Sequence, residues 1–433
     1  MSTRDFLRHE AIALLTRLAQ LQPFSVNMPM VWAATISDAA MEAIDRHLSK
    51  VQVELHSSVT GFLRSLVATE TALIQPDQLQ ARFVLLKLRF NNLLDQLDIF
   101  ADVLSQRAEH GTGVWVAGLD AVAEDALQVL RGNAAHVEAP PVICFLDRGH
   151  GAAIRRARTR LPGGDLNPVA VIQVPRERMV GSGIAPSLIH EVGHQGAALL
   201  DLVETLRLQL QQKARQDPTR STAWRHYESW ISEIVADCWA LGHLGVGATI
   251  GLMGVMSLPR YFVFRMSADD PHPFPWIRVK ISLAYGALLF PCQQWARFEA
   301  LWEQLYPRRG LNDAQQHLLT QLERCLPDFV RLVAGHRSKA LGQKPFAALF
   351  PLAERQPAAL RNLARRWGEI AENYFTQPPA LAFAVVGQAR ADGLITPQIE
   401  SRLLTRCLEH WAKTTREPGH RSLRPPVRTF IHD

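Results

Sequence analysis

Two histidines stand four residues apart in the segment His190-Glu-Val-Gly-His194. On a helix, this H-E-x-x-H spacing puts both imidazoles on one face, where they can bind one Zn²⁺ ion, and leaves Glu191 able to act on metal-bound water. The pattern therefore requires a helix, and apolar residues at helical spacing indicate one from about residue 188 to 213. A buried helix with two core histidines is the alternative, but a glutamate buried without a metal or another cation would be costly.

A third ligand must come from elsewhere in the chain, because a hydrolytic zinc site usually takes three protein ligands and leaves the fourth position to water. The longer metzincin pattern would require glycine and histidine where the chain has Ala197 and Leu200. Glu233 is the predicted third ligand, on a second helix expected over residues 222–244. Glu228 on the same helix is the competing candidate.

Asp237 lies four residues after Glu233 and shares its helix face. A ligating histidine needs its other ring nitrogen held by a carboxylate or a carbonyl, and we expect Asp237 to serve His190 in this way. His243, further along the same helix, is expected to be a core or lining histidine, with metal binding as the alternative.

The segments His190-Glu-Val-Gly-His194 and Glu233-Ile-Val-Ala-Asp237 together resemble the gluzincin metallopeptidases. The E-x-x-A-D form is similar to the HtpX-like and CAAX prenyl protease family, which also carries a His-Pro pair followed by an arginine. His272-Pro273 and Arg278 match these in order and rough spacing, and the resemblance covers about residues 140–300. It implies zinc ligands His190, His194 and Glu233, a general base at Glu191, a supporting Asp237, and a substrate- or oxyanion-facing role for His272.

The chemistry expected of such a site is peptide-bond hydrolysis by zinc-bound water, with Glu191 as the proton acceptor. The oxyanion that forms needs a hydrogen-bond donor. His272 is the first choice for this donor, and Tyr227 and Arg278 are the alternatives. The β-type run 169–174, just before the metal-binding helix, is expected to offer a sheet edge on which an extended protein or peptide substrate pairs.

Two other functions remain open on the sequence. In the first, the chain is a non-catalytic zinc-containing binding or scaffold protein whose helical domains recognise a protein partner. Glu191 argues against this, because a structural zinc site has no use for a base and closes its fourth position with another side chain. In the second, the site is a zinc amidase that acts on a non-peptide amide.

The remaining segments predict helical scaffold around a small sheet. Proline and glycine are almost absent from residues 31–110, and the apolar spacing there is helical. The expected fold class is mainly α (α+β), with a zincin-like core. The expected domains are a helical N-terminal domain (1–135), the metallopeptidase core (136–300), a helical C-terminal domain (301–415) and a flexible basic tail (416–433).

The five cysteines are widely spaced and form no C-x-x-C pair, which argues against a disulfide framework or a thiolate metal site. The N-terminus carries charges of both signs where a secretory signal would have an uninterrupted apolar core. We therefore expect a cytoplasmic protein.

Residues 238–259 contain no aspartate, glutamate, lysine or arginine and are long enough to suggest a membrane span. Their glycines lower the helix propensity, so a buried hairpin of two short helices, split near residues 245–247, is expected instead. Membrane contact through this segment is the alternative.

The net charge of +6 is mild for 433 residues. Arginines gather in the segment 155–160 and in the tail, where solvated surfaces are the expected environment. No nucleic-acid motif accompanies them, so no nucleic-acid partner is expected.

Overall fold

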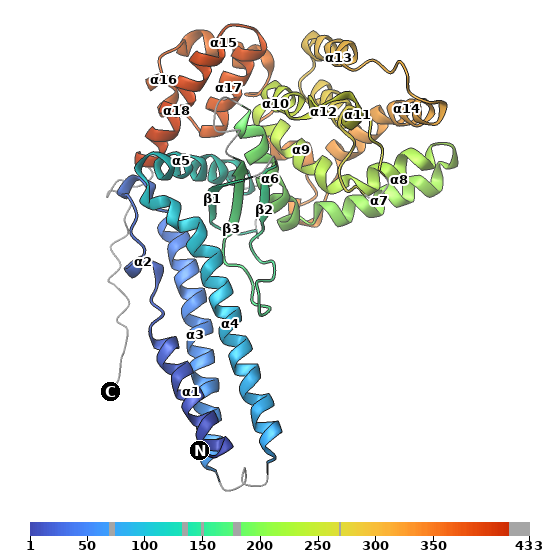
Figure 1. Cartoon of the computed structure of the whole chain (residues 1–433). Helices are drawn as coiled ribbons and strands as arrows, with labels where there is room; N and C mark the ends of the chain where they lie inside the picture. Colours follow the sequence, from blue (N-terminus) through green and yellow to red (C-terminus); the bar gives the residue numbers. More distant parts are fainter. Residues whose placement is uncertain (69–73, 132–136, 149–150, 176–182, 268–269, 415–433) are drawn as a thin grey trace.

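The computed structural model describes residues 1–68, 74–131, 137–148, 151–175, 183–267 and 270–414. With 72% helix and 4% strand, it confirms a mainly helical protein with one small sheet. A long bundle of helices projects from a wider body that contains the sheet and the remaining helices (Figure 1).

The projecting bundle, here called the N-terminal arm, consists of α1 (Thr3–Ala19), α3 (Asp38–Val67) and α4 (Pro76–Ser105). The short α2 (Phe24–Asn27) lies between the first two in sequence. Each long helix buries one apolar stripe against the other two. In α3 the buried residues recur mostly at three- or four-residue intervals, as helical spacing requires: Ala40, Ile44, Leu48, Leu55, Val59, Phe62 and Leu66.

The hydrophobic cluster of the arm continues beyond α4 onto the sheet, where it includes Ile143 and Val171. Helix α5 (His110–Leu127) lies within the expected N-terminal domain, yet most of its buried residues belong to the hydrophobic cluster of the body. A buried ion pair joins the two parts: Arg107 Nη1 lies 2.8 Å from Asp120 Oδ2, and the Cys144 amide donates to Asp120 Oδ1 at 2.7 Å. The connection between arm and body is therefore built from α5 and the first strand.

The sheet has three strands, β1 (Val142–Asp147), β2 (Ala153–Arg155) and β3 (Ala170–Pro175), in the order β1-β3-β2. Strand β3 pairs parallel with β1 and antiparallel with β2. The run 169–174 is confirmed as a strand, but its expected place at a sheet edge is wrong because both of its sides are paired. The edge strands of the described sheet are β1 and β2. Strand β2 has only three residues, too few for an alternation that would predict a strand from the sequence.

The first metal-motif helix is shorter than expected. Helix α6 (Ile184–Leu199) ends where Asp201 adopts φ 54°, and α7 (Leu202–Gln216) follows after this turn. The helix expected over 222–244 is likewise two helices, α8 (Ser221–Ser229) and α9 (Ile231–Leu244), separated at Trp230. Neither break involves proline or glycine, so apolar periodicity alone did not reveal them.

Helices α6 and α9 cross at small residues within their two motifs. A Cβ atom added at Gly193 would lie 2.8 Å from Trp239 Cβ and 2.9 Å from Ala236 Cα, closer than real Cβ contacts come. One turn on, a Cβ at Gly196 would strike the Trp239 ring at 2.3 Å. The absence of side chains at these glycines lets the backbones approach closely, which brings Glu233 over the two histidines.

The uncharged segment 238–259 folds as the expected hairpin, from the second half of α9 into the next helix. Gly245 has φ 56° and turns the chain from α9 into α10 (Val246–Met256), which packs back beside α6 and α17. Within the described part of the chain, no helix is long and apolar enough to cross a membrane.

The remaining helices cover the body from the side away from the sheet (Figure 1). Helices α14 and α17 from the expected C-terminal domain contribute to the same hydrophobic cluster as α6 and α9. The helices that cover the body in this way are α11 (Arg260–Val263), α12 (Pro275–Leu289), α13 (Gln293–Leu305), α14 (Asp313–Gly335), α15 (Pro357–Trp367), α16 (Glu372–Phe375), α17 (Pro379–Ala391) and α18 (Pro397–Thr414).

A Gly193→Ala substitution tests the close crossing. We expect it to lower the free energy of unfolding by about 1–3 kcal/mol, because the new methyl group must force α6 and α9 apart. The matched control is Gly254→Ala on α10, where an added Cβ meets no atom within 4 Å. It should leave stability unchanged or raise it by about 0.5 kcal/mol. Denaturant unfolding of both variants measures the difference, and equal stabilities would contradict the packing described.

Candidate metal centre

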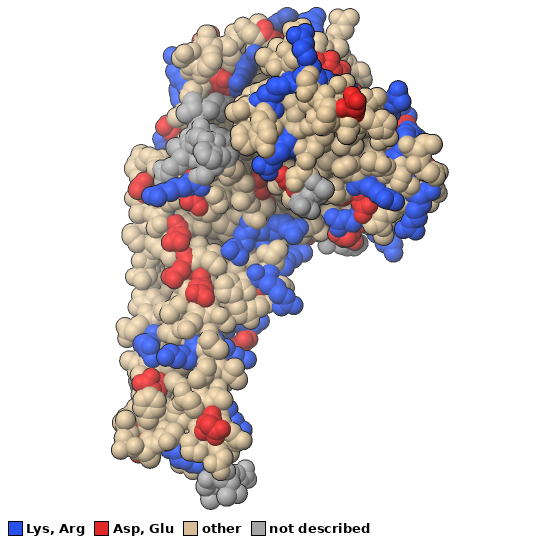
Figure 2. Space-filling model, turned by 45° about the vertical axis from the view of Figure 1, so that its right-hand side comes forward, with Lys and Arg blue, Asp and Glu red and all other residues tan. Residues whose placement is uncertain are grey.

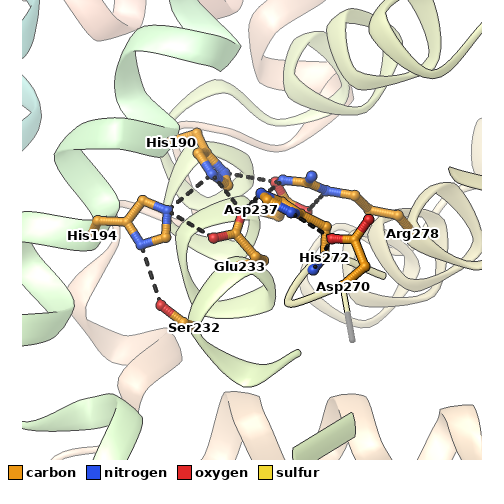
Figure 3. A network of polar contacts seen from close by, with 8 residues as sticks. All are labelled: His190, His194, Ser232, Glu233, Asp237, Asp270, His272 and Arg278. Carbon is orange, nitrogen blue, oxygen red and sulfur yellow. Dashed lines mark hydrogen bonds and ion pairs between the residues drawn. The ribbon is translucent and has the colours of Figure 1, made fainter. Parts of the chain in front are cut away.

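The H-E-x-x-H residues lie on the floor of a cavity of about 580 Å³ in the body. His190 and His194 come from α6, and Glu233 and Asp237 come from α9 (Figure 3). The cavity walls are formed by the β2 edge with its preceding residues, 151–154, and by the inner face of α10. The close crossing of α6 and α9 thus joins two halves of one site.

Potential ligand atoms of three residues converge at this point, all within 4.8 Å of one another. His190 Nε2 and His194 Nε2 are 3.2 Å apart; His190 Nε2 lies 3.3 Å from Glu233 Oε2, and His194 Nε2 lies 3.3 Å from Glu233 Oε1. A tetrahedral zinc ion with bonds of about 2.0–2.1 Å has ligand atoms about 3.3–3.4 Å apart. The spacing therefore fits the expected ligand set, His190, His194 and Glu233.

The cluster needs a cation for electrostatic reasons as well. The three side chains turn lone pairs toward a common point, and each is at least half-buried in water-poor surroundings. Elsewhere in the residues that the structure describes, no other group of three histidine, cysteine or acidic side chains converges in this way. A proton or a metal ion must therefore lie among these atoms.

The other nitrogen of His190 is held as predicted. Its Nδ1 lies 2.8 Å from Asp237 Oδ1, so that in the neutral imidazole Nδ1 carries the proton and Nε2 offers its lone pair to a metal ion. Arg278 from α12 donates two hydrogen bonds to the same carboxylate, from Nε to Oδ2 at 2.7 Å and from Nη2 to Oδ1 at 2.9 Å. Burial alone would raise the pKa of Asp237, but Arg278 and His190 lower it to about 2. Asp237 thus stays ionised.

Arg278 was predicted as a possible substrate or oxyanion contact, but its guanidinium pairs with acidic side chains of α9. Besides Asp237 it reaches Glu233, with Nη2 3.5 Å from Oε2, and the whole side chain is about 90% buried. Its guanidinium therefore neutralises the two acids of α9. The sequence did not predict a role for Ser232, the residue directly before Glu233. Its Oγ lies 3.4 Å from His194 Nδ1.

Glu191 lines the cavity beside the two histidines and is 7% exposed. Burial raises the pKa of its carboxyl, against the opposing effect of His190 and His194. A carboxyl group whose pKa is moved toward neutrality is suited to accept a proton from water and return it later.

His272 reaches the same centre from the loop before α12. Its Nε2 lies 3.3 Å from Glu233 Oε2, and its Nδ1 lies 2.9 Å from Asp270 Oδ1 (Figure 3). The Asp270 carboxylate also accepts the His272 backbone amide at 3.0 Å, which fixes the loop. Half of the His272 side chain is exposed, at the cavity mouth.

Three candidates lie away from the cavity. The Tyr227 hydroxyl donates to Leu322 O at 2.7 Å and its ring stacks on Phe329, so its predicted oxyanion role is wrong. Glu228 accepts a bond from Gln211 at 2.7 Å and is no ligand. His243 is a buried core histidine, as expected, and burial lowers its pKa to about 3.

Comparison with known proteins gives no match: no family model fits the chain, and neither a curated protein nor a solved structure is similar to it. The interpretation of the site therefore rests on its own geometry and chemistry.

The metal-free site should bind zinc in exchange for a proton. Burial would lower the pKa of His190, but Asp237 and Glu233 raise it to about 9, above its ordinary value of 6.5. At pH 7 this imidazole is protonated, and zinc requires it neutral. We expect the apparent zinc affinity to rise about tenfold per pH unit up to about pH 9. Calorimetry in buffers of different ionisation enthalpy measures the proton released, and a pH-independent affinity would contradict the assignment.

Loss of the Asp237 charge should weaken metal binding. In Asp237→Asn, His190 loses its ionic partner and Arg278 is left with one acid, so we expect a decrease of about 10- to 100-fold in zinc affinity. Ser232→Ala, which removes only the longer contact to His194, is the matched control and should cause a clearly smaller loss. Competition with a chelator of known zinc affinity measures both, and equal losses would mean that Asp237 has no special role.

Proposed function

We propose that this protein is a zinc-dependent peptidase with a zincin-like core, in which His190, His194 and Glu233 hold the metal. The observation that carries the proposal is the spacing of 3.2–3.3 Å among their ligand atoms, with Glu191 buried beside them. A bound Zn²⁺ would polarise a carbonyl group and lower the pKa of a coordinated water. The resemblance to gluzincins in the two motifs agrees with this chemistry.

In the proposed hydrolysis, each of the side chains around the metal site has a specific role. Glu191 accepts the proton from the attacking water and passes it to the leaving amine, for which its raised pKa is suited. His272, held by Asp270 at the mouth of the cavity, is the candidate donor to the developing oxyanion. Asp237 and Arg278 keep His190 oriented throughout.

The shape of the cavity favours an extended peptide as substrate. Residues 151–154, which include the start of β2, form one wall, and β2 pairs only with β3 in the described sheet. A peptide can therefore add to its outer side through main-chain hydrogen bonds. The opposite wall is the apolar face of α10, where Ala248, Leu252 and Val255 can receive an apolar side chain.

We also propose a cytoplasmic location. All five cysteines are free in the structure, which suits a reducing compartment.

Glu191→Gln tests the proposal. We expect the variant to retain zinc at one ion per chain and to lose hydrolysis by about 10²- to 10⁴-fold, because only the proton acceptor is removed. Cleavage of an unfolded protein mixture, read by mass spectrometry of new termini, is the measurement. Glu228→Gln is the matched control, since Glu228 lies outside the cavity, and it should cleave like the parent protein.

Two outcomes would contradict the proposal. If the parent protein takes up no zinc, the site is not a metal centre. If zinc is bound but no cleavage depends on Glu191, the alternative of a zinc-containing scaffold protein is favoured.

A further inference from the structure

The backbone of the segment that follows β2 is hydrogen-bonded to two buried side-chain amides, those of Asn167 and Gln195. Asn167 donates from Nδ2 to the carbonyl oxygens of Arg155 and Arg156, at 3.3 and 3.2 Å. The Ala157 amide donates to Gln195 Oε1 at 2.8 Å. Both amide side chains are 1% exposed, and Gln195 directly follows the metal-ligand candidate His194 on α6. The backbone that carries Arg156 is therefore tied to the helix that carries the site.

The turn beyond Arg156 is equally constrained. Arg158 adopts φ 64°, a conformation that is uncommon for residues other than glycine. Its amide donates to Asn167 O at 2.8 Å, and Arg160 forms a bridge with Leu166. Backbone strain of this kind persists only where the surroundings over-determine it, and it is frequent at ligand-binding segments.

Four exposed arginines lie on this rigid segment: Arg155, Arg156, Arg158 and Arg160. The guanidinium groups of Arg158 and Arg160 donate to the carbonyl oxygens of Glu138 and Gly164. No carboxylate in the described residues pairs with Arg155 or Arg156. Figure 2 shows basic side chains gathered where the arm meets the body, at the level of the sheet.

Arg156 differs from the other three because it lines the cavity of the metal centre. The other cation of this cavity, Arg278, is already engaged with Asp237 and Glu233. Of the two arginines that line this cavity in the described part of the chain, Arg156 is therefore the one available to a substrate lying along β2, next to the point where a peptide would be cut.

We propose that Arg156 is a specificity-determining residue that binds a carboxylate of the substrate, so that acidic peptides are preferred; this rests on the proposed peptidase function. The carboxylate belongs to an aspartate or glutamate side chain or to the C-terminus of the peptide. A guanidinium can bind either through two parallel hydrogen bonds. A nucleic acid fits the cavity less well, because its opposite wall is apolar and its floor carries Glu191, Glu233 and Asp237.

The test uses two matched libraries of short peptides, one containing aspartate and glutamate and the other asparagine and glutamine in their place. Each is prepared with a free and with an amidated C-terminus, which separates the two sources of the carboxylate. For the zinc-loaded protein we expect kcat/KM to be about 10- to 100-fold higher for the acidic peptides or, if the C-terminus is the ligand, for those with a free C-terminus. This preference should disappear in Arg156→Gln and decrease at high salt.

Arg160→Gln is the matched control, because it removes the same charge from the same segment outside the cavity, and it should keep the preference. The same libraries are also measured for binding to zinc-loaded Glu191→Gln protein, so that recognition is read separately from turnover. Absence of cleavage with a preserved, Arg156-dependent acidic preference in binding would contradict the peptidase function alone.

The inference is overturned by any of three results. The first is that the parent protein shows no preference for carboxylates in either assay. The second is that Arg156→Gln retains the preference of the parent protein. The third is Arg156-dependent binding of a single-stranded oligonucleotide without any preference among peptides, which would assign the segment to nucleic acid.

Discussion

The close crossing of α6 and α9 is the contact on which the site depends. Gly193 and Ala236 lie inside the two motifs and allow the backbones to approach until Glu233 reaches the rings of His190 and His194. Larger side chains at the crossing would separate the ligands even if every ligand were retained. The two motifs therefore carry packing information as well as chemistry: the small residues set the distance across which the ligating side chains act.

The site then has to balance buried charge. Glu233 and Asp237 bring two carboxylates into one mostly buried cluster, and Arg278 supplies only one fixed positive charge. The remaining charge must come from a proton on His190 or from a metal ion. In the same way, the carboxylates of Asp237 and Glu233 raise the pKa of His190 to about 9. Beside this cluster, burial raises the pKa of the Glu191 carboxyl. Arg156 lines the same cavity and pairs with no carboxylate among the described residues.

The convergence of the two motifs on one cluster of side chains could be predicted from the sequence because it follows from helix geometry. Residues four positions apart on a helix share a face whatever the rest of the fold does. The pairs His190/His194 and Glu233/Asp237 therefore converge once the two helices that carry them pack against each other. Positions that depend on tertiary packing could not be read in this way. Tyr227 is close in sequence to Ser232, which contacts His194. The break at Trp230 nevertheless separates the two residues onto different helices, and the Tyr227 side chain points toward α14. The edge strand β2 could not be predicted, because three residues are too few to show an alternation of apolar and polar side chains. For the same reason the sequence did not predict that Arg156 lines the cavity.

X-ray absorption spectroscopy of the zinc-loaded protein tests the central claim most directly, because it reports the atoms bound to the metal. The account predicts one zinc ion per chain with two imidazole nitrogens and oxygen ligands at about 2.0–2.1 Å, and no sulfur. It also predicts that a Glu233→Gln protein shows the same two imidazoles with an altered oxygen shell. A sulfur ligand, a single imidazole, or a spectrum unaffected by the loss of the Glu233 carboxylate would contradict it.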